Sequence, residues 1–148
     1  MKLPNYSVEE LSQFRLQECQ GTIIGGLVCA IRYGSSAETY GYDMMALQRV
    51  DWSRANSAEK IAAVFWQHYQ TTYGFGDQLC VEETPEAIVL TMPSLAAAAE
   101  YQLNHWAATE AQLNDLQRGY WRAIDELCGV RSKLEFNSRQ HRVTLFRS

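Results

Sequence analysis

Hydrophobic and polar positions divide the chain into helical segments followed by β-rich segments. Residues 7–20, "SVEELSQFRLQECQ", begin with an N-cap serine and two first-turn acids, and continue in strong helix formers. The apolar stretch "GTIIGGLVCAIRYG", residues 21–34, extends this pattern to Tyr33, with Gly34 just past the helix end. We expect a first helix of about 26 residues, whose second half is apolar on nearly every side and therefore buried.

The sequence of residues 21–34 fits neither a membrane span nor a phosphate loop. No segment reaches the roughly 18 to 20 apolar residues that a span requires. Gly21, Gly25 and Gly26 fit neither GxGxxG nor GxxxxGK[ST], and no strand precedes them. Glycine inside a helix costs about 1 kcal/mol relative to alanine. Three glycines in one helix therefore indicate that something approaches the backbone closely. It is either a neighbouring helix or sheet, or a bound ligand.

The middle of the chain predicts two more helices and a hairpin. Residues 36–50 form a shorter second helix, interrupted or bent near Gly41. The third helix lies in "NSAEKIAAVFWQHYQTTYG", where Asn56 and Glu59 form a capping box and Gly74 is the stop. Two β-rich runs then flank Thr84-Pro85-Glu86, a pattern typical of a β-hairpin.

The remaining sequence predicts one long helix and a second hairpin. Pro93-Ser94 opens a continuous helix that runs to Cys128 and ends at Gly129. The segment "VRSKLEFNSRQHRVTLFRS" alternates and turns near Asn137-Ser138. Residues 1–148 are therefore expected to form a single α+β domain. Three N-terminal helices precede a β-hairpin, a long helix and a β-hairpin, and the long helix packs on a small antiparallel sheet.

Composition and charge narrow the class of protein. A chain of 148 residues with 47% hydrophobic and 20% charged residues is a folded domain, and its net charge of −4 argues against a nucleic-acid partner. The basic residues near the C-terminus would lie on both faces of a sheet, so we expect them at solvated edges and not in one phosphate-binding surface. They are Arg131, Lys133, Arg139, Arg142 and Arg147. The first residues carry acids and amides where a signal peptide carries an apolar run, so we expect a cytoplasmic protein without a membrane partner.

The four cysteines, at positions 19, 29, 80 and 128, show no CxxC pair. This spacing indicates neither a zinc ribbon nor a disulfide framework, and no metal or cofactor is expected. We interpret them as reduced, mostly buried and unreactive thiols. Cys29 and Cys19 are the alternative nucleophiles, and either one would need a basic neighbour supplied by the fold to form a reactive thiolate.

Polar residues on apolar helix faces are the candidate catalytic groups. At about 100° per residue, Glu110 and Gln117 fall in the apolar stripe of the long helix, and His68 falls in that of the third helix. A buried polar group without a partner costs roughly 2 to 7 kcal/mol. Glu110 can pair with an arginine such as Arg32, and His68 with a backbone carbonyl. Alternatively, His68 acts as a general base that Glu110 orients, or Glu110 binds a cationic substrate group.

The predicted pocket lies where these faces converge with the glycine-rich half of the first helix. Tyrosine and tryptophan side chains suit core margins, dimer interfaces and small-molecule pockets alike. The candidate ligand-binding residues combine missing side chains, aromatic rings and an amide; they are Gly25, Gly26, Trp66, Trp106, Gln117 and Tyr120.

Three segments, "AIRYGSSAETYGYDMM", "YGFGDQL" and "ELCGVRSKLEFNSRQHRVTLFR", resemble a bacterial family named for 2-aminothiazoline-4-carboxylate hydrolase. That family is similar in layout to vinyl-reductase-type ligand-binding domains. The resemblance spans about the last two thirds of the chain and rests on element order. It implies an α+β domain that encloses a small-molecule cavity, often in a dimer. The family's C-terminal hairpin often carries cysteines and this one has none, so no catalytic residue is transferred.

Two classes of function follow from the sequence. The first is a small-molecule-binding domain or a hydrolase-like enzyme that acts on a small cyclic or aromatic substrate, and we expect it to form a homodimer. The second is an interaction or dimerisation protein that uses aromatic-rich surfaces. A tetrapyrrole-binding sensor, with His68 or His105 as axial ligand, is a further alternative.

Overall fold

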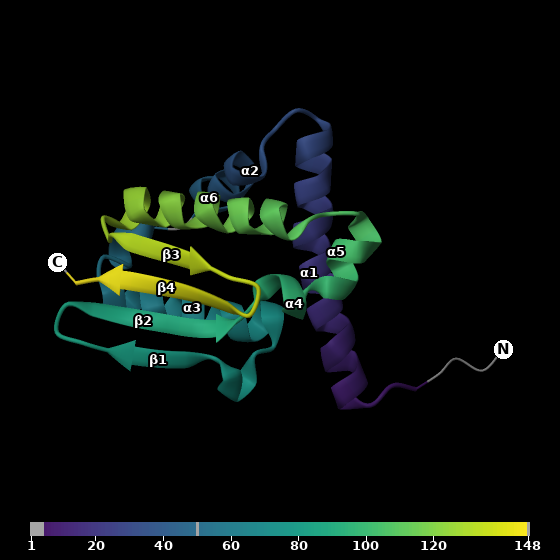
Figure 1. The fold of residues 1–148 in the computed structure, drawn as a ribbon, viewed down its shortest axis with the longest axis horizontal. Helices are drawn as coiled ribbons and strands as arrows, with labels where there is room; N and C mark the ends of the chain where they lie inside the picture. The colour runs from purple at the N-terminus through teal and green to yellow at the C-terminus, as the bar shows by residue number, and fades with distance from the viewer. Residues whose placement is uncertain (1–4, 50, 148) are drawn as a thin grey trace.

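The computed structural model describes residues 5–49 and 51–147, and it places helices against one face and around one end of an antiparallel sheet (Figure 1). The expected α+β class, with its three N-terminal helices and two hairpins, is confirmed. The helices are α1 (Val8–Arg32), α2 (Ala37–Ala46), α3 (Ala58–Tyr73), α4 (Leu95–Ala98), α5 (Glu100–Trp106) and α6 (Glu110–Cys128). The strands are β1 (Cys80–Glu83), β2 (Ala87–Pro93), β3 (Ser132–Phe136) and β4 (Gln140–Phe146), and two short 3₁₀ turns are η1 (Trp52–Arg54) and η2 (Gly76–Gln78).

Helix α1 begins and ends where its sequence predicts. Ser7 is the N-cap: its hydroxyl accepts the Glu10 N–H at 3.2 Å, and its own N–H donates to the Glu10 carboxylate at 2.7 Å. Gly34 follows the helix with φ of +92°. The second half is buried mainly on one side, through Ile24, Gly25 and Leu27. Residues 8–15 are all exposed, so the first half of α1 makes little contact with the rest of the protein.

Two details of the next helices differ from the sequence prediction. The N-cap of α3 is Ser57, whose hydroxyl accepts the Lys60 N–H, whereas the Asn56 side chain accepts from the Lys60 ammonium group at 3.0 Å. Gly41 does not interrupt or bend α2. It lies inside the regular helix, where a Cβ atom would collide with the backbone carbonyl of Leu116 in α6. The glycine therefore allows α2 and α6 to pack backbone against backbone.

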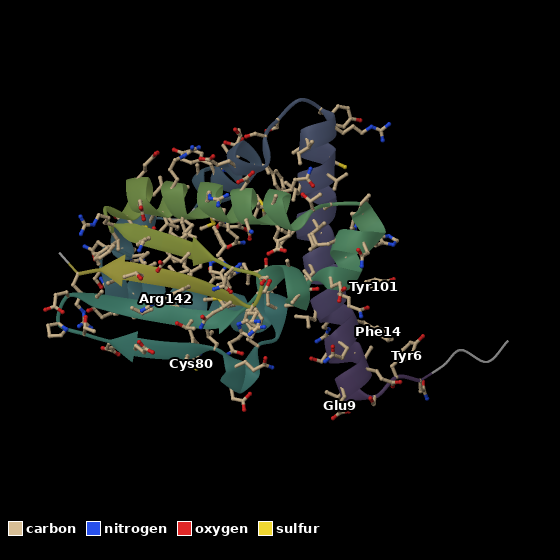
Figure 2. The ribbon with its side chains drawn as sticks, in the orientation of Figure 1. Tyr6, Glu9, Phe14, Cys80, Tyr101 and Arg142 are labelled. Atoms are coloured by element: carbon tan, nitrogen blue, oxygen red, sulfur yellow. The ribbon has the colours of Figure 1, made fainter. Side chains whose placement is uncertain are left out.

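The two hairpins form one sheet with strand order β1-β2-β4-β3, antiparallel throughout. Pairing of β2 with β4 joins the hairpins and sets Leu90 opposite Val143 and Ile88 opposite Leu145. These side chains are buried against the helices. Cys80 and Arg142, which both neighbour Thr91 in the register, are exposed on the opposite face, which Figure 2 turns toward the viewer. The sheet therefore has one buried and one open face.

The predicted continuous helix from Ser94 to Cys128 is wrong, because the chain breaks twice. It departs from helical geometry at Ala99, and Ala107 adopts a left-handed φ of +53°. Thr109 then caps α6 in a capping box with Gln112. These breaks let α5 pack on α1 while α6 lies beside the sheet (Figure 1). Trp121 of α6 lies in the hydrophobic core that joins the helices to the sheet.

Candidate functional site

The structure brings together two of the predicted site residues, His68 of α3 and Tyr120 of α6. Their ring centroids lie 6.1 Å apart, and both rings line one partly open cavity of about 150 Å³. The cavity wall comes from α2, η1, α3 and α6 and consists of Met45, Gln48, Trp52, Val64, Phe65, His68 and Tyr120. Trp52 and Val64 also line a wider apolar cleft of about 600 Å³ on the outer side. These two side chains therefore lie between the cavity and the outer cleft.

The predicted convergence of His68 and Glu110 is not found, because Glu110 is exposed and lines a different cleft with Ser94 and Ser138. The break at Ala107 makes Glu110 the first residue of α6 instead of a residue in the middle of a helix. A carboxylate is favourable there because the helix dipole is positive at that end. Glu110 therefore has a structural reason to be acidic, and it makes no ion pair with Arg32 among the described residues.

The other predicted ligand-binding residues lie apart from this cavity. A Cβ atom on Gly25 would lie 2.9 Å from the Trp106 ring, and one on Gly26 would collide with the Tyr40 hydroxyl. The expected close approach is thus made by two aromatic side chains. Trp66 lines a surface cleft with Val81 and Glu83. Gln117 is only 2% exposed in α6, and it does not line the His68 cavity.

His68 is a neutral imidazole held by a hydroxyl group. Its Nδ1 atom lies 3.3 Å from Thr72 Oγ1, where the sequence suggested a backbone carbonyl as partner. Thr72 Oγ1 also accepts from the Cys19 thiol at 3.9 Å. The Thr72 hydroxyl can donate to Nδ1 or accept from it, according to which ring nitrogen of His68 carries the proton. Burial lowers the pKa of His68, which keeps the ring uncharged at neutral pH.

The remaining polar groups of the cavity are also uncharged. The Trp52 Nε1–H is buried and has no acceptor among the described residues. Burial raises the pKa of Tyr120, so its hydroxyl stays protonated. No Asp, Glu, Lys or Arg is among the residues that line this cavity. The site can therefore exchange hydrogen bonds with a neutral molecule, and His68 is the one basic side chain among the residues that line it.

The cysteines differ from the sequence prediction, since only Cys128 is buried and Cys19, Cys29 and Cys80 are exposed. All four are free thiols. Cys19 and Cys29 lie on α1 and Cys80 lies on the edge strand β1, positions where the sequence pattern did not separate exposed from buried sides. No group of three or more His, Cys, Asp or Glu side chains in residues 5–49 and 51–147 is placed to hold a metal ion.

Sequence reasoning missed His141, the most deeply buried histidine. It is 1% exposed on β4, and neither ring nitrogen has a hydrogen-bond partner among the described residues. The Phe136 ring meets it edge-on at 4.4 Å, and the Tyr69 ring lies 6.1 Å away. Burial lowers its pKa to about 3. The signal was present in "QHRVTLF", where alternation places His141 on the same face as Val143 and Leu145.

Comparisons with known proteins place the chain in no family. No protein-family model, no curated protein and no solved structure matches it. Within the described part of the chain, every helix is too short or too polar to cross a bilayer.

Proposed function

We propose that the protein binds a small, uncharged, ring-shaped molecule in the cavity between His68, Trp52 and Tyr120. The observation that carries this proposal is the buried Trp52 Nε1–H, which has no acceptor among the described residues although the Trp52 side chain lines this cavity. A buried donor without a partner is costly, and a ligand that accepts its hydrogen bond would recover part of that cost. The neutral His68 ring and the protonated Tyr120 hydroxyl supply the other polar contacts.

The size of the cavity favours a compact ligand. An apolar cavity of about 150 Å³ is large enough for benzene. Pockets for drug-sized ligands begin at roughly 300 Å³, so a tetrapyrrole on His68 is the less favoured alternative. His105, the other predicted axial ligand, is exposed and stacked on Tyr101. The resemblance to the 2-aminothiazoline-4-carboxylate hydrolase family also favours a small ring, as ligand or as substrate.

Binding is better supported than catalysis. His68 can act as a general base, but Glu110 lies elsewhere and no carboxylate lines the cavity to orient the imidazole. Thr72 takes that orienting position, and a hydroxyl stabilises an imidazolium less than a carboxylate does. A hydrolase-like reaction is therefore an extension of the proposal. We also propose a reducing cytoplasmic location, which the four free thiols support.

Benzene and phenol form a matched pair of probes for the cavity. Saturation-transfer NMR and calorimetry would measure binding of both to the wild type, with phenol the tighter because its oxygen can accept from Trp52. We expect Trp52→Phe to weaken phenol about tenfold, the loss of one hydrogen bond in a buried site, and to change benzene little.

Trp66→Phe is the control, since Trp66 lies in another cleft. Each variant is first checked for an unchanged melting temperature. Absence of binding by both probes, or equal loss in Trp52→Phe and Trp66→Phe, would contradict the proposal. An interaction protein, the second class of function, is favoured by exposed aromatic side chains on α1 and α5, namely Phe14, Tyr101 and Trp106.

A further inference from the structure

The outer cleft continues the candidate ligand site toward the surface of the protein. Its volume is about 600 Å³, and its wall consists of Asp51, Trp52, Arg54, Ala55, Lys60, Ala63 and Val64. Trp52 and Val64 also belong to the wall of the cavity that His68 lines. The outer cleft and the cavity are therefore neighbouring spaces that share two apolar side chains.

Helix α3 runs along both spaces. Lys60, Val64 and His68 follow one another at four-residue spacing, so they lie on one side of the helix. Lys60 and Val64 line the outer cleft, whereas Val64 and His68 line the cavity. The 3₁₀ turn η1 supplies Trp52 to both walls. A ligand that occupies both spaces therefore has its polar contacts with His68 at the inner end.

The part of the outer cleft that adjoins the cavity is apolar. Val64 is 45% exposed, and Ala63 beside it is exposed as well. Trp52 and Ala55 pack against the hydrophobic core and are only partly buried. Exposed apolar surface that gathers in one concave place is typical of a ligand-binding groove. A hydrocarbon group in the outer cleft would remove this surface from water, which is favourable.

The charged residues of the outer cleft favour an uncharged occupant. Asp51 is negative, Arg54 and Lys60 are positive, and all three are exposed. The Asp51 carboxylate accepts from the Ser53 hydroxyl at 2.5 Å, and the Lys60 ammonium group donates to the Asn56 side chain at 3.0 Å. A charged group on the ligand would therefore meet both signs in a solvated place, where an ion pair contributes little.

We propose that the ligand is an uncharged ring that carries an apolar chain, with the ring in the cavity and the chain in the outer cleft. This inference rests on the proposed function and adds to it the class of ligand. The cavity of about 150 Å³ is smaller than the roughly 300 to 1,000 Å³ of ordinary ligand pockets, and the outer cleft supplies the missing space. A single ring makes few contacts, so its affinity alone is modest.

Short alkylphenols test the proposal, because phenol measures the ring site alone. Calorimetry would compare phenol with methyl-, ethyl-, propyl- and butylphenols, substituted at position 3 or 4 so that one series directs its chain toward Trp52 and Val64. We expect the affinity of one series to rise about threefold for each added methylene group, as a chain removed from water does. A chain that remains in solvent would give no such rise.

Ala63→Glu separates the chain from the ring. Ala63 lines the outer cleft and is not among the residues that line the cavity. A carboxylate at this position should weaken butylphenol about tenfold, because the chain would lie against a charged group, and should leave phenol binding unchanged. Ala111→Glu is the matched control at an exposed position of α6 that lines neither space, and it should leave both phenols unchanged. Each variant is first checked for an unchanged melting temperature.

The outcomes distinguish this inference from the proposed function. Phenol that binds with the expected dependence on Trp52, while no alkyl chain improves its affinity, would overturn the inference and leave the proposed function standing. A gain from the chain that is equal in the wild type and in Ala63→Glu would also overturn the inference, because the chain would then lie elsewhere. Absence of binding by phenol and by every alkylphenol would overturn the proposed function together with the inference.

Discussion

His141 is an imidazole buried among aromatic rings without a hydrogen-bond partner among the described residues. The nearby Tyr69 ring carries a hydroxyl that accepts from Trp121 Nε1 at 3.2 Å. A charged ring would be expensive there, which is why burial lowers the pKa of His141 to about 3. His68 differs because Thr72 satisfies one of its nitrogens and a cavity lies beside it. The two histidines therefore have different roles, one in packing and one at the candidate site.

The low pKa of His141 predicts a loss of stability in acid. An unfolded histidine titrates near pH 6.5, so the stability that the neutral ring contributes is complete above that pH and falls as the pH drops toward 3. The loss is about 1.4 kcal/mol per pH unit in this window. Urea unfolding at several pH values between 7 and 4 would measure it. The free energy of unfolding of His141→Leu should depend less steeply on pH. His68 is present in both proteins, so its contribution cancels when the two are compared. Equal pH dependence of stability in the wild type and His141→Leu would contradict the assignment of this acid-induced loss to His141.

At the scale of elements, the sequence predicted the strands, both hairpins and α1 well, because alternation, caps and glycine stops are local signals. The helix from residue 94 to 128 failed because its apolar stripe continues through the break. A local signal was nevertheless present, since Thr109 and Gln112 form a capping box. Ala107 gave no such signal, because alanine is a strong helix former, yet its left-handed φ of +53° belongs to the C-cap of α5, which the Ala108 N–H closes by donating to the Leu103 carbonyl at 2.9 Å.

Ala107→Gly should stabilise the protein. An L-residue in the left-handed region carries a penalty of about 1 to 2 kcal/mol that glycine does not carry. Glycine loses more backbone entropy on folding, so we expect a net gain of about 0.5 to 1 kcal/mol in the free energy of unfolding. Ala63→Gly, the same change inside α3, should instead cost about 1 kcal/mol. Urea denaturation of both variants checks the contrast, and a destabilised Ala107→Gly would show that the turn contributes more than strain.

The pairing of α2 with α6 depends on two glycines whose role the sequence analysis did not identify. A Cβ atom on Gly119 would collide with the Glu38 carbonyl, a backbone atom that cannot move freely. Gly119→Ala should therefore cost about 3 kcal/mol. Gly21→Ala is the matched control: its Cβ atom would meet the Gln102 side chain at 3.0 Å, which can shift, and it should be close to neutral. Equal melting temperatures for the two variants would contradict the close approach of the helices.

At the scale of the whole molecule, one hydrophobic core joins the sheet to α2, α3, α6 and the second half of α1. The candidate cavity lies at the edge of this core, between segments that are far apart in the chain. This is why sequence reasoning found His68 and Tyr120 but missed Trp52. Local patterns identify a polar residue on an apolar helix face, whereas Trp52 lies in a short 3₁₀ turn whose position depends on tertiary contacts. Glu110 was predicted on a buried helix face because the break at Ala107 was not predicted.

The division of α1 predicts uneven hydrogen exchange along a single helix. Residues 8–15 are exposed, whereas Ile24 and Leu27 are buried in the core. In dilute, monomeric protein, amides of residues 12–18 should exchange through local fraying and those of residues 24–32 only through wider unfolding, orders of magnitude more slowly. Mass spectrometry of peptic fragments measures both halves in one sample. Uniform protection along α1 in the monomer would mean that contacts within the chain already hold the first half in place.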